Sequence, residues 1–119
     1  MGTTVKNLSF FHRLRNASRG ISSALGLEAS FRTELVMAIL ALYSTLYLRP
    51  QAIWLALVVV MIALVLAAEL FNTALEHTLD ALHPAQAEFV RIAKDCAAGA
   101  VLVLSLASVA VFVLMLCYG

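Results

Sequence analysis

Charged residues are scarce in this sequence. Only 13% of the 119 residues carry a charge, whereas 63% are hydrophobic and the mean hydropathy is +0.97. So few charges cannot cover a water-exposed surface, which excludes an ordinary soluble domain and indicates a membrane protein. The length allows one domain at most, so we expect a single membrane domain over residues 1–119. The net charge of +1 is uninformative by itself, and we expect no nucleic-acid partner.

The sequence also has only two cysteines and neither of the common nucleotide-binding loop motifs. Cys96 and Cys117 lie at opposite ends of one apolar run and cannot pair within a single helix, so we expect apolar fillers without a redox or metal role. Neither G-x-x-x-x-G-K-[ST] nor G-x-G-x-x-G occurs, which excludes the known soluble nucleotide-binding loops. Residues 1–9 are polar and expected to be loose, and the N-terminal region lacks the apolar core of a signal peptide.

A polar stripe directly follows an apolar segment. Residues 52–68 are seventeen consecutive uncharged, apolar-class residues, about the length that a membrane-spanning helix needs. Glu69, Asn72, Glu76 and Asp80 come next, at spacings of three, four and four residues. On a helix these side chains fall within an arc of roughly 80° over about 16 Å. Three carboxylates at a membrane boundary are costly without a cation, so a divalent metal is the expected partner.

The hydropathy pattern predicts four helices. Apolar residues recur at helical spacing over 10–25 opposite a basic face, which is typical of a membrane-interface helix; a soluble partner-binding helix is the alternative. Gly26 is expected to break the chain before the next helix. The helices that contain the three spans are expected over about 28–48, 52–82 and 88–118, with joints at Pro50 and Pro84. The predicted fold class is therefore all-α, with an amphipathic surface helix and three transmembrane helices.

Basic residues predict the orientation of these spans. Those on the N-terminal side of the first span and between the second and third are Arg13, Arg15, Arg19, Arg32, Arg91 and Lys94. The joint between the first two spans holds only Arg49. By the positive-inside rule, the N-terminus and the 83–95 connection are cytoplasmic and the C-terminus is outside. The polar stripe then lies on the cytoplasmic side, and the small residues at 97–100 offer a face for close helix packing.

Carboxylates beside a lysine at a lipid boundary suit phosphoryl transfer. Mg²⁺ is typically held by one or two carboxylates and phosphate oxygens, while a remaining carboxylate can deprotonate a hydroxyl. The spacing leaves open a proton- or cation-coupled carrier and a structural bundle with a polar seam. A zinc site is a further alternative, formed from His12, His77 and His83 with Glu76 or Asp80. Glu28 has a purely structural explanation as the i, i+4 ion-pair partner of Arg32.

Three charged motifs carry a resemblance to a known family. They are Glu28-Ala-Ser-Phe-Arg-x-Glu34, Glu69-x-x-Asn72-x-Ala-x-Glu76-x-x-x-Asp80, and Ala93-Lys94-Asp95 followed by Ala97-Ala98-Gly99-Ala100-Val101. In order and spacing they resemble the bacterial integral-membrane diacylglycerol kinases, and the related undecaprenol kinases share the latter two motifs. The resemblance covers residues 18–118. It implies ATP- and Mg²⁺-dependent phosphorylation of a lipid hydroxyl by a homotrimer in the bacterial cytoplasmic (inner) membrane.

The same resemblance implies roles for individual residues. Glu69 would be the general base at the lipid hydroxyl, and Arg32 and Trp54 would also contact lipid. Glu28 and Glu76 would hold the metal. The residues that would contact or order the nucleotide are Glu28, Asn72, Glu76, Lys94 and Asp95. Asp80 and Arg32 would support the site.

Two departures from the family pattern concern the lipid substrate. Residues 16–20, Asn-Ala-Ser-Arg-Gly, resemble the undecaprenol kinases more than the Gly-Tyr-Ser-x-Lys-Gly-like run of the diacylglycerol kinases. Ala98 replaces a serine that is often found at that position. The 28–34 motif favours diacylglycerol, so we expect a diacylglycerol kinase that produces phosphatidic acid. Undecaprenol kinase is the alternative within the family, and a small cation- or proton-coupled carrier is the alternative from another class.

Overall fold

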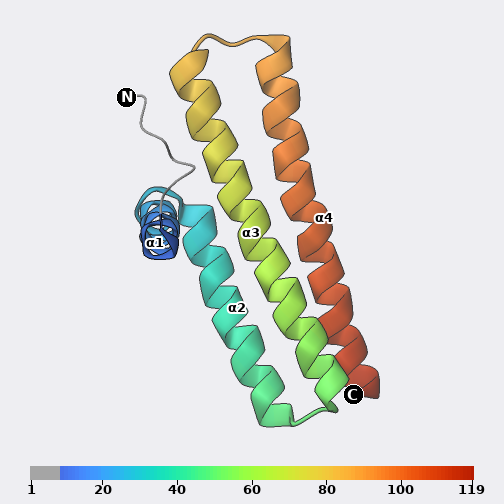
Figure 1. Ribbon diagram of the computed structural model, residues 1–119. Coiled ribbons are helices and arrows are strands. Elements are labelled where there is room, and N and C mark those ends of the chain that lie inside the picture. The colour runs from blue at the N-terminus through green and yellow to red at the C-terminus, as the bar shows by residue number, and fades with distance from the viewer. Residues whose placement is uncertain (1–8) are drawn as a thin grey trace.

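Four helices and no strand make up residues 9–119, the part of the chain that the computed structural model describes. They are α1 (Phe10–Leu27), α2 (Ala29–Leu48), α3 (Ala52–Leu82) and α4 (Glu88–Tyr118). Helix α3 lies between α2 and α4 and runs antiparallel to both, and α1 lies across the start of α2 (Figure 1). The predicted all-α fold class is confirmed. The expectation of a loose segment over 1–9 falls, apart from Ser9, outside the described residues.

Helix α1 is amphipathic and longer than the sequence pattern predicts. It begins at the N-cap Ser9, whose hydroxyl accepts from the His12 backbone N–H at 3.4 Å. Its large apolar side chains remain exposed: Phe10, Phe11, Leu14 and Ile21. The predicted break at Gly26 is wrong, because the helix continues to Leu27. Glu28 makes the break by adopting an extended backbone that needs no glycine, with φ −118° and ψ 114°.

The predicted ion pair between Glu28 and Arg32 is also wrong. The Arg32 guanidinium donates from Nη1 to the Leu25 carbonyl at 2.8 Å, and no ion pair joins it to Glu28 within residues 9–119. Glu28 is the N-cap residue of α2: its carbonyl accepts from the Arg32 N–H at 3.3 Å, but its extended backbone does not give the side chain the i, i+4 placement of a helical residue. The last carbonyls of α1 have no partner inside their own helix, which makes Leu25 a ready acceptor. Arg32 therefore ties α1 to α2.

A short joint turns α2 back into α3. Arg49 takes the left-handed conformation, with φ 51° and ψ 54°, and its N–H caps α2 by donating to the Thr45 carbonyl at 3.2 Å. Pro50 follows, and α3 begins after the N-cap Gln51. Because the joint is so short, α2 and α3 form the antiparallel hairpin that the sequence predicts.

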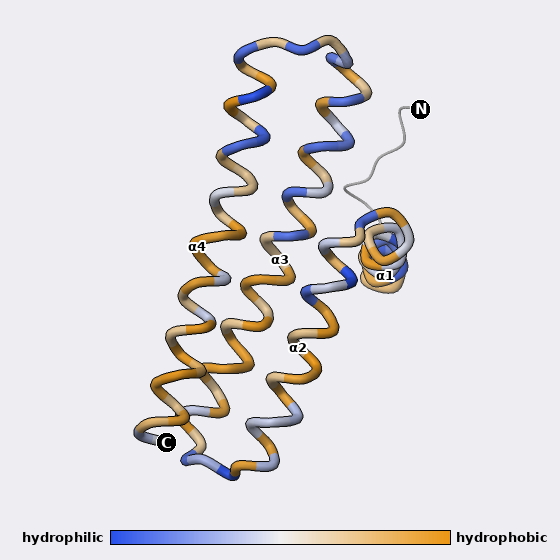
Figure 2. Tube along the Cα trace, turned by 180° about the vertical axis from the view of Figure 1, so that it is seen from behind, coloured by the Kyte–Doolittle hydropathy of each residue, from blue (hydrophilic) through white to orange (hydrophobic). Residues whose placement is uncertain are grey.

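Few side chains are buried inside the bundle. The molecule is a slab with extents of 51 × 39 × 22 Å, and its buried apolar residues are Ala24, Phe31, Val58, Val65, Val90 and Met115. Helices α2, α3 and α4 are long and apolar enough to cross a membrane by length and composition. Hydrophilic residues gather at the end that carries the α3–α4 turn, while apolar residues dominate the rest of the bundle (Figure 2). The protein is thus a multi-pass membrane protein whose apolar helix faces point outward.

Candidate active site

Glu69 is a buried carboxylate where the apolar segment of α3 ends. The residue is only 4% exposed, and Oε2 accepts a hydrogen bond from Ser30 Oγ on the first turn of α2 at 3.3 Å. Thr73 Oγ1 donates to the Glu69 backbone carbonyl at 2.9 Å. Within residues 9–119 the second carboxylate oxygen, Oε1, has no hydrogen-bond partner. Glu69 therefore keeps one oxygen available to a proton donor.

Three other carboxylates act on the charge of Glu69. Glu34, Glu28 and Glu76 all repel it, and within residues 9–119 none of these four acids forms an ion pair. Unpaired carboxylates are hard oxygen ligands, and one or two of them can hold a divalent cation together with phosphate oxygens. The six-residue spacing predicts Glu34 on a different face from Glu28. The charges of both nevertheless act on Glu69, and because Glu28 is an extended N-cap residue, helical spacing does not relate its side chain to that of Glu34.

Asn72 and Glu76 continue the polar face of α3. Asn72 donates from Nδ2 to Glu76 Oε2 at 3.4 Å. Its other amide atom, Oδ1, is buried without a hydrogen-bond partner in the described part of the chain. An unmatched buried acceptor costs about 1–3 kcal/mol, so a donor or cation that reaches this oxygen gains free energy. Asn72 and Glu76 thus add to the set of oxygens that fits a metal–phosphate ligand.

Ion pairs organise the polar ends of α3 and α4. Lys94 Nζ lies 2.7 Å from Asp80 Oδ1 and also interacts with the charge of Glu76. Arg91 contacts Asp95 at 2.9 Å and Glu88 at 2.7 Å along α4. These contacts bring Lys94 to the stripe, as the sequence predicts, whereas Asp95 is held on its own helix. No role in the site was predicted for Arg91. Its spacing of three residues from Glu88 and four from Asp95 nevertheless indicates ion pairs along a helix.

Some predicted site residues lie apart from this cluster. Trp54 is in the first turn of α3, about 22 Å along the helix axis from Glu69. Arg32 is occupied at the α1–α2 joint. Within one chain, therefore, the three predicted lipid contacts do not form a single site. Ser30 and Glu34 belong to the site although no role was predicted for them, and their i, i+4 spacing on α2 is the signal that connects them.

The histidines and acids of the zinc alternative do not form a metal site in the described part of the chain. Residues 9–119 contain no group of three or more His, Cys, Asp or Glu side chains placed to hold a metal ion. His12 Nδ1 pairs with the Ser9 hydroxyl at 2.8 Å, and His83 Nδ1 lies 2.9 Å from the Ala85 carbonyl. A cation held by one or two carboxylates and completed by phosphate oxygens needs no such protein cage.

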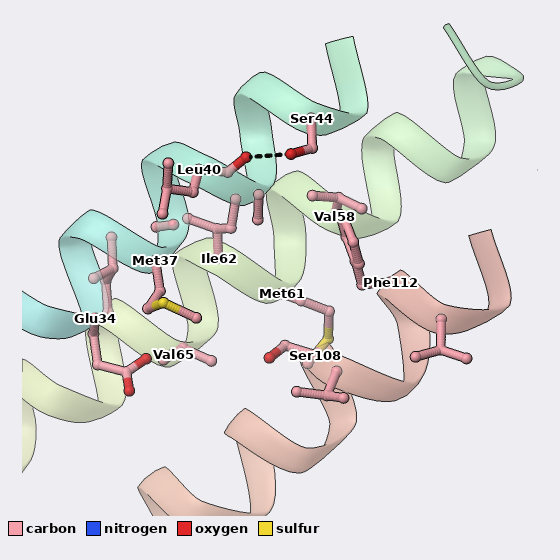
Figure 3. Close-up of a pocket in the computed structure, with 15 residues that line it drawn as sticks. Glu34, Met37, Leu40, Ser44, Val58, Met61, Ile62, Val65, Ser108 and Phe112 are labelled. Atoms are coloured by element: carbon pink, nitrogen blue, oxygen red, sulfur yellow. Dashed lines mark hydrogen bonds between the residues drawn. The ribbon is translucent and has the colours of Figure 1, made fainter. Parts of the chain in front are cut away.

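An apolar groove begins beside the carboxylates. It is a cavity of ≈ 330 Å³ between α2, α3 and α4, lined mainly by apolar side chains. Glu34 lies at one end, and Ser44 and Phe112 lie toward the other (Figure 3). Val65, one turn before Glu69, also lines the groove, so its polar end lies close to the buried carboxylate. The shape and chemistry suit a hydrocarbon chain with a polar head at the Glu69 end.

Comparison with known proteins identifies the family. Residues 15–116 match the family described as prokaryotic diacylglycerol kinase. The chain is 37% identical over 98 residues to a protein of Synechocystis named diacylglycerol kinase, a match that covers 82% of this chain and 56% of that protein. It is 31% identical over 99 residues to the undecaprenol kinase of Bacillus subtilis, covering 83% of this chain and 80% of that protein.

The chain thus spans little more than half the length of the Synechocystis relative. The family match, however, covers most of this chain, including every polar residue of the cluster described above. Phosphoryl transfer by such a family requires a divalent metal, which agrees with the unpaired carboxylates around Glu69. Together with the three-span helical fold, this match shows that the chain belongs to the prokaryotic diacylglycerol kinase family, a family of membrane lipid kinases.

Proposed function

We propose that this protein transfers the γ-phosphate of ATP to the hydroxyl of diacylglycerol, giving phosphatidic acid and ADP. One observation carries the proposal: the buried Glu69 keeps a free carboxylate oxygen one helical turn beyond Val65, which lines an apolar groove, and further unpaired acids act on its charge. A lipid hydroxyl that enters along this groove meets a proton acceptor at the boundary between hydrocarbon and water.

In the proposed chemical step the protein forms no covalent bond to the phosphoryl group; it positions the reactants and accepts a proton. Glu69 Oε1 takes the proton of the lipid hydroxyl as the hydroxyl oxygen forms a bond to the γ-phosphorus. The bond between the γ-phosphorus and the β–γ bridging oxygen breaks, and ADP leaves with that oxygen. The groove holds the lipid chain so that its hydroxyl reaches the base, and proximity of this kind supplies a large part of the rate enhancement.

Glu28 and Glu76 are the residues that would hold Mg²⁺, together with the phosphate oxygens of the nucleotide. The ion would neutralise charge on the phosphates and so lower the barrier to transfer. Lys94 offers a point charge to a phosphate, and Asp80 orients it through their ion pair. Asn72 and Asp95 complete the proposed nucleotide contacts, with Asn72 Oδ1 supplying an unused acceptor.

The preference for diacylglycerol is supported by the 28–34 motif and by the name of the Synechocystis relative. Undecaprenol is the second candidate, which residues 16–20 and the Bacillus subtilis relative favour. Both substrates present a hydroxyl on an apolar chain, so one groove and one base serve either reaction. The proposed location is the bacterial inner membrane, with the polar end of α3 and α4 in the cytoplasm.

A homotrimer is part of the same proposal. The outward-facing apolar faces of the slab need lipid or further helices to cover them. A second groove, between α3 and α4 alone, carries small residues that permit close approach. These small residues are Ala67, Ala68, Ala97 and Ala100. A neighbouring subunit would also let Trp54 or Arg32 contact lipid at a site in another chain.

The decisive experiment is phosphate transfer by purified protein in mixed micelles. Labelled ATP is supplied with diacylglycerol or with undecaprenol at matched mole fractions, and Glu69→Gln serves as the matched inactive control. We expect labelled phosphatidic acid from the parent protein and a smaller yield from undecaprenol. Transfer to undecaprenol alone would identify undecaprenol, in place of diacylglycerol, as the substrate. Transport in sealed vesicles without ATP, and no transfer to either alcohol, would favour a carrier instead.

A further inference from the structure

Ser30 makes the one side-chain hydrogen bond that joins α2 to α3 within residues 9–119. Its hydroxyl donates to Glu69 Oε2 at 3.3 Å, across 39 positions of sequence. Ser30 itself lies at an exposed position in the first turn of α2, whereas its acceptor is buried. The contact therefore links a solvent-accessible hydroxyl to the proposed general base.

The break between α1 and α2 explains why this hydroxyl reaches across. Two other hydroxyl side chains of α2, Ser44 and Thr45, each donate to the carbonyl four residues earlier at 2.8 Å. For Ser30 that position is Gly26, which belongs to α1 and lies before the extended Glu28. Without a helical carbonyl in reach, the hydroxyl bonds to Glu69.

A carboxylate that acts as a base must present one oxygen in a defined direction. Glu69 has no other side-chain partner in the described residues, and the charges of Glu34, Glu28 and Glu76 repel its own. A donor on Oε2 opposes that repulsion and restricts rotation of the carboxylate. Small errors in the placement of a reacting group are costly in rate, so this restriction has a catalytic consequence.

We propose that Ser30 is a positioning residue: its hydroxyl holds Glu69 Oε2 so that Oε1 faces the hydroxyl of the lipid alcohol. The inference rests on the proposed function, in which Glu69 is the general base. Ser30 touches neither the phosphate nor the transferred proton. It acts through Glu69, so its removal lowers turnover and leaves the binding of Mg-ATP unchanged.

The test compares three variants of the full-length protein in lipid micelles. Ser30→Ala removes the donor, Ser30→Thr keeps a hydroxyl, and Thr33→Ala removes a nearby exposed hydroxyl that makes no side-chain hydrogen bond in the described residues. We expect Ser30→Ala to lower kcat about 10-fold, the worth of a hydrogen bond to a charged group, with the KM for Mg-ATP unchanged. Ser30→Thr should restore most of the loss, and Thr33→Ala should match the parent.

Combination with Glu69→Gln separates this inference from the proposed function. If Ser30 acts through Glu69, Ser30→Ala causes no further loss in the Glu69→Gln background. If Ser30→Ala keeps the parental kcat while Glu69→Gln is impaired, the role of Ser30 is overturned and the proposed function is retained. Equal losses in both backgrounds also overturn it. Normal turnover in Glu69→Gln itself overturns the proposed function. Alanine favours helix, so folding of Ser30→Ala is retained.

Discussion

Lys94 Nζ lies 2.7 Å from Asp80 Oδ1, and this contact joins α4 to α3 at the polar end of the bundle. Both side chains are partly exposed, at 32% for Lys94 and 65% for Asp80, so water screens the pair and its contribution to stability is small. Its importance is the placement of charge. Lys94 also interacts with Glu76, so the ion pair keeps the cation beside the acids of the stripe.

Asp80→Asn should weaken nucleotide binding modestly. The amide keeps the shape of the side chain but removes the charge that orients Lys94, so the KM for Mg-ATP should rise up to about fivefold. Steady-state assays at saturating lipid measure this change. Glu88→Gln is the matched control, because it removes an acid from the exposed Arg91 pair at the same end. Equal effects in both variants would mean that Asp80 has no special relation to the nucleotide.

Glu69→Gln should bind Mg-ATP nearly as well as the parent and turn over about 10²–10⁴ times more slowly. The amide preserves the size of the side chain but cannot accept the hydroxyl proton, and the factor is the usual worth of general-base catalysis. Equilibrium binding of Mg-ATP is measured beside kcat at saturating lipid. Loss of Mg-ATP binding in this variant, with binding intact in Glu76→Gln, would reverse the two assignments.

Glu76→Gln should lose affinity for Mg-ATP, and an excess of Mg²⁺ or replacement by Mn²⁺ should restore part of it. The amide removes one of the two proposed carboxylate ligands, and Mn²⁺ binds oxygen ligands readily enough to compensate. Titration of activity with each metal at fixed ATP measures the effect. A defect that no concentration of either metal changes would assign Glu76 a role apart from metal binding.

Mixtures of Glu69→Gln and Glu76→Gln chains test assembly and shared sites. If residues from two subunits form one site, some mixed assemblies contain an intact site and activity returns. Cross-linking in the same micelles establishes the oligomeric state and proves that the chains have mixed. Proven co-assembly without recovered activity would confine each site to one chain.

Arg32→Ala should destabilise the joint between α1 and α2. It removes the hydrogen bond to the Leu25 carbonyl, which is worth about 1 kcal/mol. Thermal unfolding in micelles measures the loss, and Arg19→Ala is the control, since Arg19 makes no side-chain hydrogen bond in residues 9–119. An unchanged unfolding temperature with a raised lipid KM would instead make Arg32 a lipid contact, as the family resemblance implies.

The errors of sequence-based prediction cluster at the α1–α2 joint. Gly26 was predicted to end the first helix, yet Glu28 makes the break because its N–H still caps α1 at the Ala24 carbonyl, 2.9 Å away. The Glu28–Arg32 pair was predicted from helical spacing, which an extended residue does not obey. The two bond partners of this joint, Leu25 for Arg32 and Glu69 for Ser30, are absent from any local pattern.

The sequence by itself determined the number and order of the helices, the approximate extent of the three long ones, the membrane class and the stripe on α3. These properties depend on apolar run length and helical periodicity, which act along a continuous segment. Only the tertiary structure decided that Ser30 bonds to Glu69, that the charge of Glu34 acts on Glu69 and that Arg32 bonds to Leu25. Such contacts depend on where the chain breaks before α2 and on the axial register of α2 against α3. Moving the break by one residue would rotate every α2 side chain by about 100° about the helix axis. The position of the break and the register therefore depend on how the helices pack, which no local sequence pattern shows.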